Sequence, residues 1–242
     1  MGKSGKSRKR VRRLNRKAIR VGKPKNTVMK KMLLFLVVLL FSFQIAAFSQ
    51  KTRVGIMGGT VISHMYTKIN GIKEDNHGLF NITAGMLLDV PLAGKIVFRP
   101  NLSYVQKGKW RHEGIGDNKA KISDELRYAE MYLNFIYNIS SVNRGLFVGI
   151  GPSVSFDVPS KREISKAGTT TNKDVKFGKT ATDDYKGMDY GANIVTGFNL
   201  GSGMFLAVNY NQGFRNLVTG TTVGKIKNSY FGFQLGMLLK NK

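Results

Sequence analysis

The chain has 242 residues, no cysteine and a formal net charge of +25. The lack of cysteine excludes a disulfide framework, a thiol nucleophile and a thiolate metal site. Of the 39 Lys and Arg residues, 14 lie in residues 1–49, a region that contains no Asp or Glu.

The N-terminal region predicts export. Residues 29–49 have a positive start, an apolar core and the small-x-small signal Ala47-Phe48-Ser49, so we interpret them as a cleavable signal helix. A membrane anchor is the alternative, although the apolar core is at the short limit for a span. Residues 1–28 are either a solvated basic tail or the product of a start codon assigned upstream of Met29. Residues 50–242 are enough for one domain.

Eight segments alternate apolar and polar residues with a period of two, the pattern of β-strands. The clearest is the hairpin of residues 189–214, in which Gly201-Ser202-Gly203 form the turn. Connections between the segments are alternately long and short, and the long ones are residues 63–77, 110–125, 159–186 and 215–226. We therefore predict an all-β fold for residues 50–242, an eight-stranded antiparallel up-and-down transmembrane β-barrel. The predicted strands are residues 52–62, 79–90, 96–109, 126–138, 146–158, 189–200, 204–214 and 228–240.

The two faces of these strands predict which side meets lipid. In residues 189–200 one face carries Ile194 and Phe198, and the other carries Asn193 and Gly197. Small polar residues suit a crowded barrel interior, so the apolar face is predicted to face hydrocarbon and the lumen to be filled, without a diffusive pore. The alternative is a soluble exported lipocalin-like binding barrel, which is apolar inside and polar outside.

Individual residues add two expectations about the strands. Tyrosines near strand ends are predicted to lie at the membrane interface, namely Tyr137, Tyr190, Tyr210 and Tyr230. Pro100 and Pro152 lack a backbone donor, so each is predicted to lie at a bulge or at locally broken pairing.

Three motifs occur along the predicted strands, RVGIMGG at 53–59, RPNLSYVQKG at 99–108 and GLFVGIGP at 145–152. Their order resembles the small outer-membrane β-barrel family common in Bacteroidetes, also called PorT-like. The resemblance implies an eight-stranded barrel in the bacterial outer membrane, inserted by the barrel-assembly machinery, and it implies little about activity. The chain departs from the family in ending on Leu239-Lys240-Asn241-Lys242 instead of an aromatic residue, and in having Asn101 where Glu is frequent.

Glu130 is the main polar candidate inside the predicted barrel. Its position in the alternation faces the lumen, on the strand next to the one that carries Arg99 and Lys107. A carboxylate in a narrow interior needs a cation, so we predict that Glu130 pairs with Arg99 or Lys107 in a structural role.

Nothing in the sequence predicts an enzyme, and no catalytic, cofactor-binding or metal-ligating residue is assigned. His64, His77 and His112 all fall in predicted loops, and neither they nor the carboxylates have metal-site spacing. The alternative is a lipid-modifying outer-membrane enzyme that uses His64 beside Ser63, or His112 beside Glu113.

The long connections are the predicted site of function. Residues 159–186 are rich in cations, and Lys161, Arg162 and Lys166 are candidates for contact with lipopolysaccharide phosphates. The expected role is structural, adhesive or partner-binding, with outer-membrane lipid or an envelope complex as partners and no nucleic acid for the mature chain.

Overall fold

The computed structural model describes residues 52–114, 119–220 and 223–239. The predicted basic segment 1–28 and signal peptide 29–49 lie outside the described residues, as do the last three residues of the chain. Within the described part, no helix is long and apolar enough to cross a membrane.

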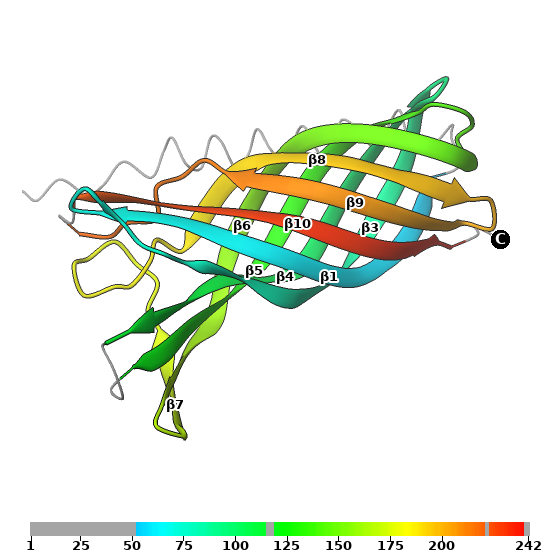
Figure 1. The fold of residues 1–242 in the computed structure, drawn as a ribbon. Coiled ribbons are helices and arrows are strands. Elements are labelled where there is room, and N and C mark those ends of the chain that lie inside the picture. Colours follow the sequence, from blue (N-terminus) through cyan, green and yellow to red (C-terminus); the bar gives the residue numbers. More distant parts are fainter. Residues whose placement is uncertain (1–51, 115–118, 221–222, 240–242) are drawn as a thin grey trace, which may run out of the picture. The chain divides into compact units, whose positions relative to one another are not determined.

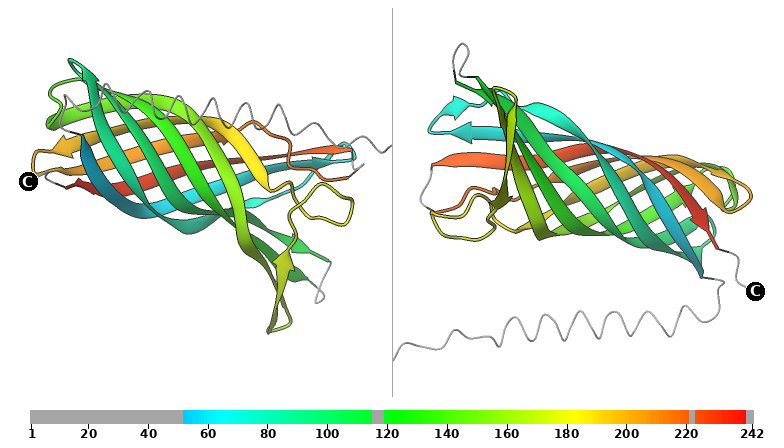
Figure 2. Two further views of the ribbon diagram at one scale, coloured as in Figure 1. Left: turned by 180° about the vertical axis from the view of Figure 1, so that it is seen from behind. Right: turned by 90° about the horizontal axis from the view of Figure 1, so that it is seen from below.

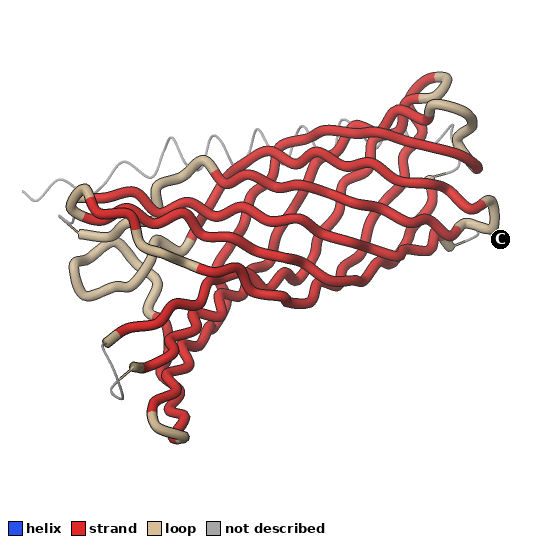
Figure 3. The backbone as a smooth tube through the Cα atoms, viewed as in Figure 1, coloured by secondary structure: helices blue, strands red, loops and turns tan. Residues whose placement is uncertain are grey.

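Almost all described residues lie in strands of one antiparallel sheet (Figures 1 and 3). The strands are β1 (Arg53–Ile69), β2 (Ile72–Lys73), β3 (His77–Ala93), β4 (Ile96–Glu113), β5 (Ala120–Asn138), β6 (Arg144–Lys166), β7 (Thr169–Val175), β8 (Met188–Leu200), β9 (Met204–Gly213) and β10 (Gly224–Leu238).

The pairing returns from the last strand to the first. β1 pairs with β3 on one side and with β10 on the other, and the order between them is β4, β5, β6, β8 and β9. Within the described residues, β2 and β7 lie outside this ring as hairpin partners of β1 and β6. The predicted all-β antiparallel barrel is therefore confirmed, and the pairing of β1 with β10 leaves neither strand with an open edge along the paired residues.

The apolar face of the strands points outward, as predicted. Ile194 and Phe233 are 56% and 48% exposed, whereas Asn193 and Asn209 are 2% and 4% exposed. This is the reverse of a soluble lipocalin-like barrel, so that alternative is wrong. Since hydrocarbon accepts apolar side chains and rejects polar ones, the outer surface matches a membrane-spanning barrel.

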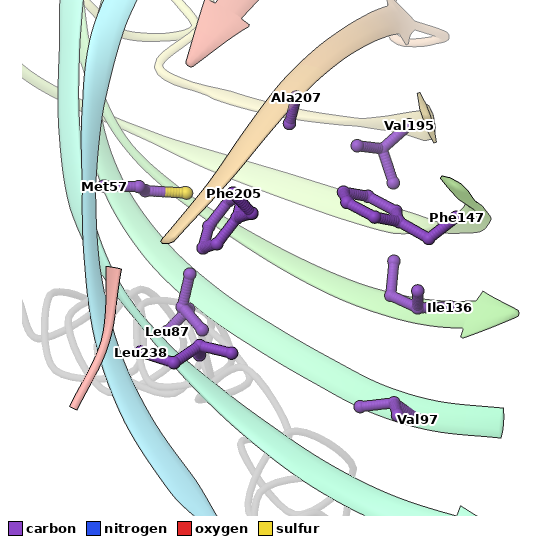
Figure 4. Close-up of a cluster of buried hydrophobic side chains, with 9 residues drawn as sticks. All are labelled: Met57, Leu87, Val97, Ile136, Phe147, Val195, Phe205, Ala207 and Leu238. Carbon is purple, nitrogen blue, oxygen red and sulfur yellow. The ribbon is translucent and has the colours of Figure 1, made fainter. Parts of the chain in front are cut away.

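Among the described residues, inward-facing side chains pack in three apolar clusters. The first lies near the short turns and is drawn in Figure 4, where its side chains converge from several strands: Met57, Leu87, Val97, Ile136, Phe147, Val195, Phe205, Ala207 and Leu238. The second contains Val61, Val105, Tyr132 and Tyr230. The third contains Met65, Leu126, Tyr128, Val175, Tyr185, Leu217, Val218 and Ile226.

The strands at the long-connection end extend further than predicted. β1 continues to Ile69, and β4 and β5 stay paired as far as Glu113 and Ala120. The predicted loop 159–186 is wrong for residues 159–166 and 169–175, which form a hairpin of β6 with β7. Figures 1 and 2 show β4 to β7 continuing beyond the ring as a protruding sheet. Alternation of apolar and polar residues fades here because both faces of these extensions are polar.

The two strand prolines lie at interrupted pairing. The β3–β4 pairs stop at Leu87–Asn101 and resume in the same register at Val90–Phe98, across the position of Pro100. The β5–β6 pairs skip the position of Pro152 in the same way. Register shifts occur elsewhere, so the prediction of locally broken pairing is confirmed and a bulge at either proline is not found.

Candidate functional site

The centre of the barrel contains a buried ion pair between neighbouring strands. Lys107 on β4 places its Nζ 2.8 Å from Oε2 of Glu130 on β5, and both side chains are at most 1% exposed. The ammonium also donates to Ser155 Oγ at 3.3 Å. It lies 5.1 Å and 4.9 Å from the ring centres of Tyr128 and Tyr230, within the range of cation–π attraction. The structure therefore brings together Glu130 and one of its two predicted partners.

Two tyrosines complete the surroundings of this pair. The hydroxyl of Tyr230 donates to Oε2 of Glu130 at 3.3 Å and contacts the hydroxyl of Tyr132. Tyr230 is 2% exposed, so its predicted place at the membrane interface is wrong. Tyr137 and Tyr190 do face outward, at 49% and 51% exposed. Tyr230 occupies an inward position of β10. The sequence could have shown this, because the next residue, Phe231, belongs to the outward apolar face.

Arg99 belongs to a second buried ion pair, nearer the short turns. Its Nε donates to Oδ1 of Asp89 at 2.7 Å, and Asp89 also accepts from Arg53 at 2.8 Å. The guanidinium lies 5.1 Å and 4.9 Å from the rings of Phe147 and Phe205. Sequence reasoning did not single out Asp89. Its inward position directly opposite Arg53 in the β1–β3 pairing is the signal that identifies it.

Amides link the strands between these two ion pairs. Asn209 donates to Asn193 at 2.9 Å, and Asn193 donates to Asn134 at 3.0 Å. A cavity of about 20 Å³ lies beside Arg99 and these amides. That volume holds about one water molecule.

A third charged cluster lies at the long-connection end, beyond the membrane-spanning part of the strands. Asp124 is fully buried and accepts from Arg162 Nε and, at 2.6 Å, from the hydroxyl of Tyr185. Arg162 also donates to Asp184 at 2.8 Å. These bonds tie β5 and β6 to the connection that follows β7.

The ionisation of this cluster follows from its burial and charges. Burial raises the pKa of Tyr185 well above its usual range, and the neighbouring Asp124 carboxylate raises it further. For Arg162, burial by itself lowers the pKa, but the hydrogen bond and charge of Asp124 outweigh it and raise the pKa overall. The tyrosine therefore stays neutral and the arginine stays charged at any physiological pH.

The three cations proposed for lipopolysaccharide contact lie on a strand, in contrast to the predicted loop. Lys161, Arg162 and Lys166 all belong to β6. Lys161 and Lys166 are exposed. Arg162 forms ion pairs with Asp124 and Asp184.

The histidines also lie on strands, so their prediction as loop residues is wrong. All three are exposed, and His77 stacks on Trp110 with ring centres 4.1 Å apart. Ser63 beside His64 faces inward, where its Oγ donates to the Gly108 carbonyl at 3.1 Å. Neighbouring residues of a strand point to opposite faces, so Ser63 and His64 do not converge. Among the described residues, no group of three or more His, Asp or Glu could hold a metal ion.

Comparison with known proteins identifies a family. A family model described as outer membrane protein beta-barrel domain matches residues 48–219. No curated protein matches the sequence.

Several solved structures are similar to this chain at low sequence identity. Ail of Yersinia pestis is 12% identical with a TM-score of 0.42, over 78% of this chain and 100% of that one. Neisserial surface protein A is 7% identical with a TM-score of 0.40, over 78% and 100%. OprG of Pseudomonas aeruginosa is 9% identical with a TM-score of 0.42, over 79% and 98%.

Proposed function

This chain belongs to the family of the outer membrane protein beta-barrel domain, and from that premise we propose that it is a non-conducting barrel with a structural or partner-binding role. It is a protein of the bacterial outer membrane. The role is exerted through the long-connection end, which we place outside the cell because outer-membrane barrels have short periplasmic turns and longer extracellular connections.

The packed interior is the observation that supports a non-conducting barrel. The ion pairs Lys107–Glu130 and Arg99–Asp89 lie in the interior with three apolar clusters. A hydrated ion would have to displace these side chains, and buried ion pairs resist displacement because a separated charge is left unpaired. Eight-stranded barrels are generally filled in this way.

The protruding sheet supports a partner-binding role. In the part of the chain that the structure describes, β7 pairs only with β6, and residues 169–174 are exposed. An exposed strand edge offers free backbone donors and acceptors to a partner strand. Such a partner is an extracellular chain or another member of an envelope complex.

We further propose that the protein is not an enzyme. His112 and Glu113 alternate along β4 as Ser63 and His64 do along β1, so neither pair supplies a nucleophile and its base on one face. Replacement of His64 and His112 by Ala is expected to leave the lipid A of the host unchanged by mass spectrometry. A change in the mass of lipid A would contradict this proposal and would favour a lipid-modifying enzyme.

Two finer assignments rest on sequence motifs. The motifs at 53–59, 99–108 and 145–152 favour membership of the PorT-like group from Bacteroidetes. Insertion by the barrel-assembly machinery is expected for that group, and β10 carries the aromatic residues Phe231 and Phe233.

Conductance across a planar lipid bilayer tests the proposed function. The purified protein, shown to be folded by heat-modifiable gel migration, is expected to give no stable conductance steps. A general porin inserted in the same bilayer is the positive control. Regular steps at each insertion of the protein would overturn the proposal of a filled barrel.

A further inference from the structure

A pocket lined with cations opens at the long-connection end of the barrel. Its volume is about 320 Å³, within the usual range of ligand pockets. It lies between β6, the connection after β7, the start of β8 and the connection after β9, and its lining includes Asp157, Lys179, Lys186, Met188 and Arg215.

The charge of this lining favours an anion. Three cations, Lys179, Lys186 and Arg215, face one carboxylate, that of Asp157. Among the described residues, no ion pair within 4.0 Å involves any of these three cations, unlike Arg162 of the neighbouring cluster. Their charge is therefore free to attract a ligand.

Hydrogen bonds hold two of the cations in place. Arg215 donates from Nη1 to the Met188 carbonyl at 2.7 Å, and its backbone N–H donates to Asp189 Oδ1 at 3.3 Å. Lys186 donates from Nζ to the Asn216 carbonyl at 3.3 Å. A guanidinium held at one nitrogen keeps other N–H groups for a planar anion such as phosphate.

The two connections that frame the pocket are also bonded to each other. The Lys186 N–H donates to the Leu217 carbonyl at 3.0 Å, and the Thr219 hydroxyl donates to the Asp183 carbonyl at 2.6 Å. Hydrogen bonds from the Thr180 hydroxyl and backbone lower the pKa of Asp183, which stays ionised and fixes this turn. The pocket therefore does not require a loop to close around a ligand, which reduces the entropic cost of binding.

The pocket lies at the edge of the surface formed by the outward-facing apolar side chains of the strands. β8 has 13 residues from Met188 to Leu200. At about 3.3 Å per residue and a tilt of about 40° it rises about 30 Å, the thickness of the hydrocarbon layer. Met188 is 41% exposed and Phe214 is 49% exposed. The charged headgroups of lipids are found at this depth, so a lipid at this position would place its phosphate near Arg215 and Lys186.

We propose that this pocket binds the phosphate group of an anionic glycolipid of the outer leaflet, with Lys179, Lys186 and Arg215 as its cationic ligands. The inference deepens the proposed function and rests on the long-connection end facing outward. It places lipid contact at the barrel rim, whereas Lys161 and Lys166 lie on the protruding hairpin of β6 with β7.

Matched charge variants test the proposal on the full protein in detergent micelles. The pocket variant is Lys179→Gln with Lys186→Gln, and the control is Lys161→Gln with Lys166→Gln, which removes the same charge from the hairpin. Binding of diphosphoryl lipid A is measured by native mass spectrometry, with dephosphorylated lipid A and excess inorganic phosphate as further arms. Heat-modifiable gel migration verifies that both variants are folded.

We expect the pocket variant to bind diphosphoryl lipid A at least about tenfold more weakly, the effect of losing one charge-assisted hydrogen bond. The control variant is expected to bind like the unchanged protein, and dephosphorylated lipid A is expected to bind weakly to all three. Equal loss of lipid A binding in both variants, or loss only in the control variant, would overturn the proposal that the pocket binds the phosphate group. Full displacement of lipid A by inorganic phosphate would overturn the lipid assignment in favour of a soluble phosphate ligand.

Failure of this test is distinguishable from failure of the proposed function. Conductance steps would overturn the filled barrel whatever the lipid result. A protein that gives no conductance steps and does not bind lipid A would leave the proposed function in place. That result would overturn only the proposal that the pocket binds lipid.

Discussion

At the scale of single residues, we expect the stability of the interior to depend on Lys107 and Glu130. Both are buried, and their 2.8 Å contact compensates two charges that would otherwise be costly away from water. The rings of Tyr128 and Tyr230 attract the same ammonium. A buried pair of this kind is costly to break on one side only, because the remaining charge then has no partner.

Glu130→Gln is therefore expected to destabilise the barrel by about 3–5 kcal/mol. Urea unfolding in detergent micelles, followed by gel migration, measures the loss. Glu125→Gln is the matched control on the same strand, since Glu125 is 41% exposed and lies 3.9 Å from Arg127. Its effect is expected to be at most about 1 kcal/mol. Equal stability of Glu130→Gln and the unchanged protein would show that the pair does not brace the interior.

At the scale of elements, β4 depends on one glycine. The β3–β4 register shifts between Gly78 and Thr83, opposite Gly108. Gly108 has a φ of +148° and is buried, although its position in the alternation is an outward one. Lys107 and Lys109 lie two residues apart and so share the inward face that the alternation of β4 gives them, and Lys109 donates to Glu74 at 2.6 Å.

Gly108→Ala is expected to cost at least about 1–3 kcal/mol, because a Cβ there would lie 1.8 Å from the Asp124 carbonyl oxygen in a backbone conformation that L-residues rarely adopt. Gly58→Ala is the matched control, since its Cβ would meet only Thr83 O, at 3.6 Å. That change is expected to stay within about 0.5 kcal/mol. Thermal unfolding of both variants in micelles makes the comparison, and equal melting temperatures would contradict the requirement for glycine at position 108.

The sequence predicts the membrane part of each element much better than its outer part. Where one face meets hydrocarbon, alternation is strict, as in Ile194 with Asn193, and the strand follows from it. Beyond the membrane both faces meet water, so Lys161 and Lys166 fall on β6 without an apolar signal. Partner choice among buried charges is harder, because it depends on strand tilt and register. The alternation puts Arg99, Lys107 and Glu130 on the same inward face. Only the structure shows that Lys107 pairs with Glu130 and that Arg99 pairs with Asp89.

At the scale of the whole molecule, the orientation of the barrel decides which surface meets partners. The chain has no cysteine, so a single introduced cysteine reports on one position. Thr170 on β7 and Ser202 in the β8–β9 turn are both exposed and lie at opposite ends of the strands.

Thr170→Cys is expected to react with a membrane-impermeant maleimide in intact cells, because the proposed orientation puts the protruding hairpin outside the cell. Ser202→Cys is expected to react only after the outer membrane is permeabilised. Labelling is read from the gel mobility of the purified protein. The reverse pattern would place the long-connection end in the periplasm and would contradict the proposed orientation.

The central claim is that the apolar face of the strands meets hydrocarbon. Nitroxide labels attached to single cysteines at Leu206 and Phe233, in protein reconstituted in lipid bilayers, test it most directly through collision rates measured by electron paramagnetic resonance. Both labels are expected to collide more with dissolved oxygen than with a water-soluble nickel complex, and a label at Ser202 is expected to show the opposite. Preferential collision with the nickel complex at Leu206 and Phe233 would mean that this face meets water and would contradict the account.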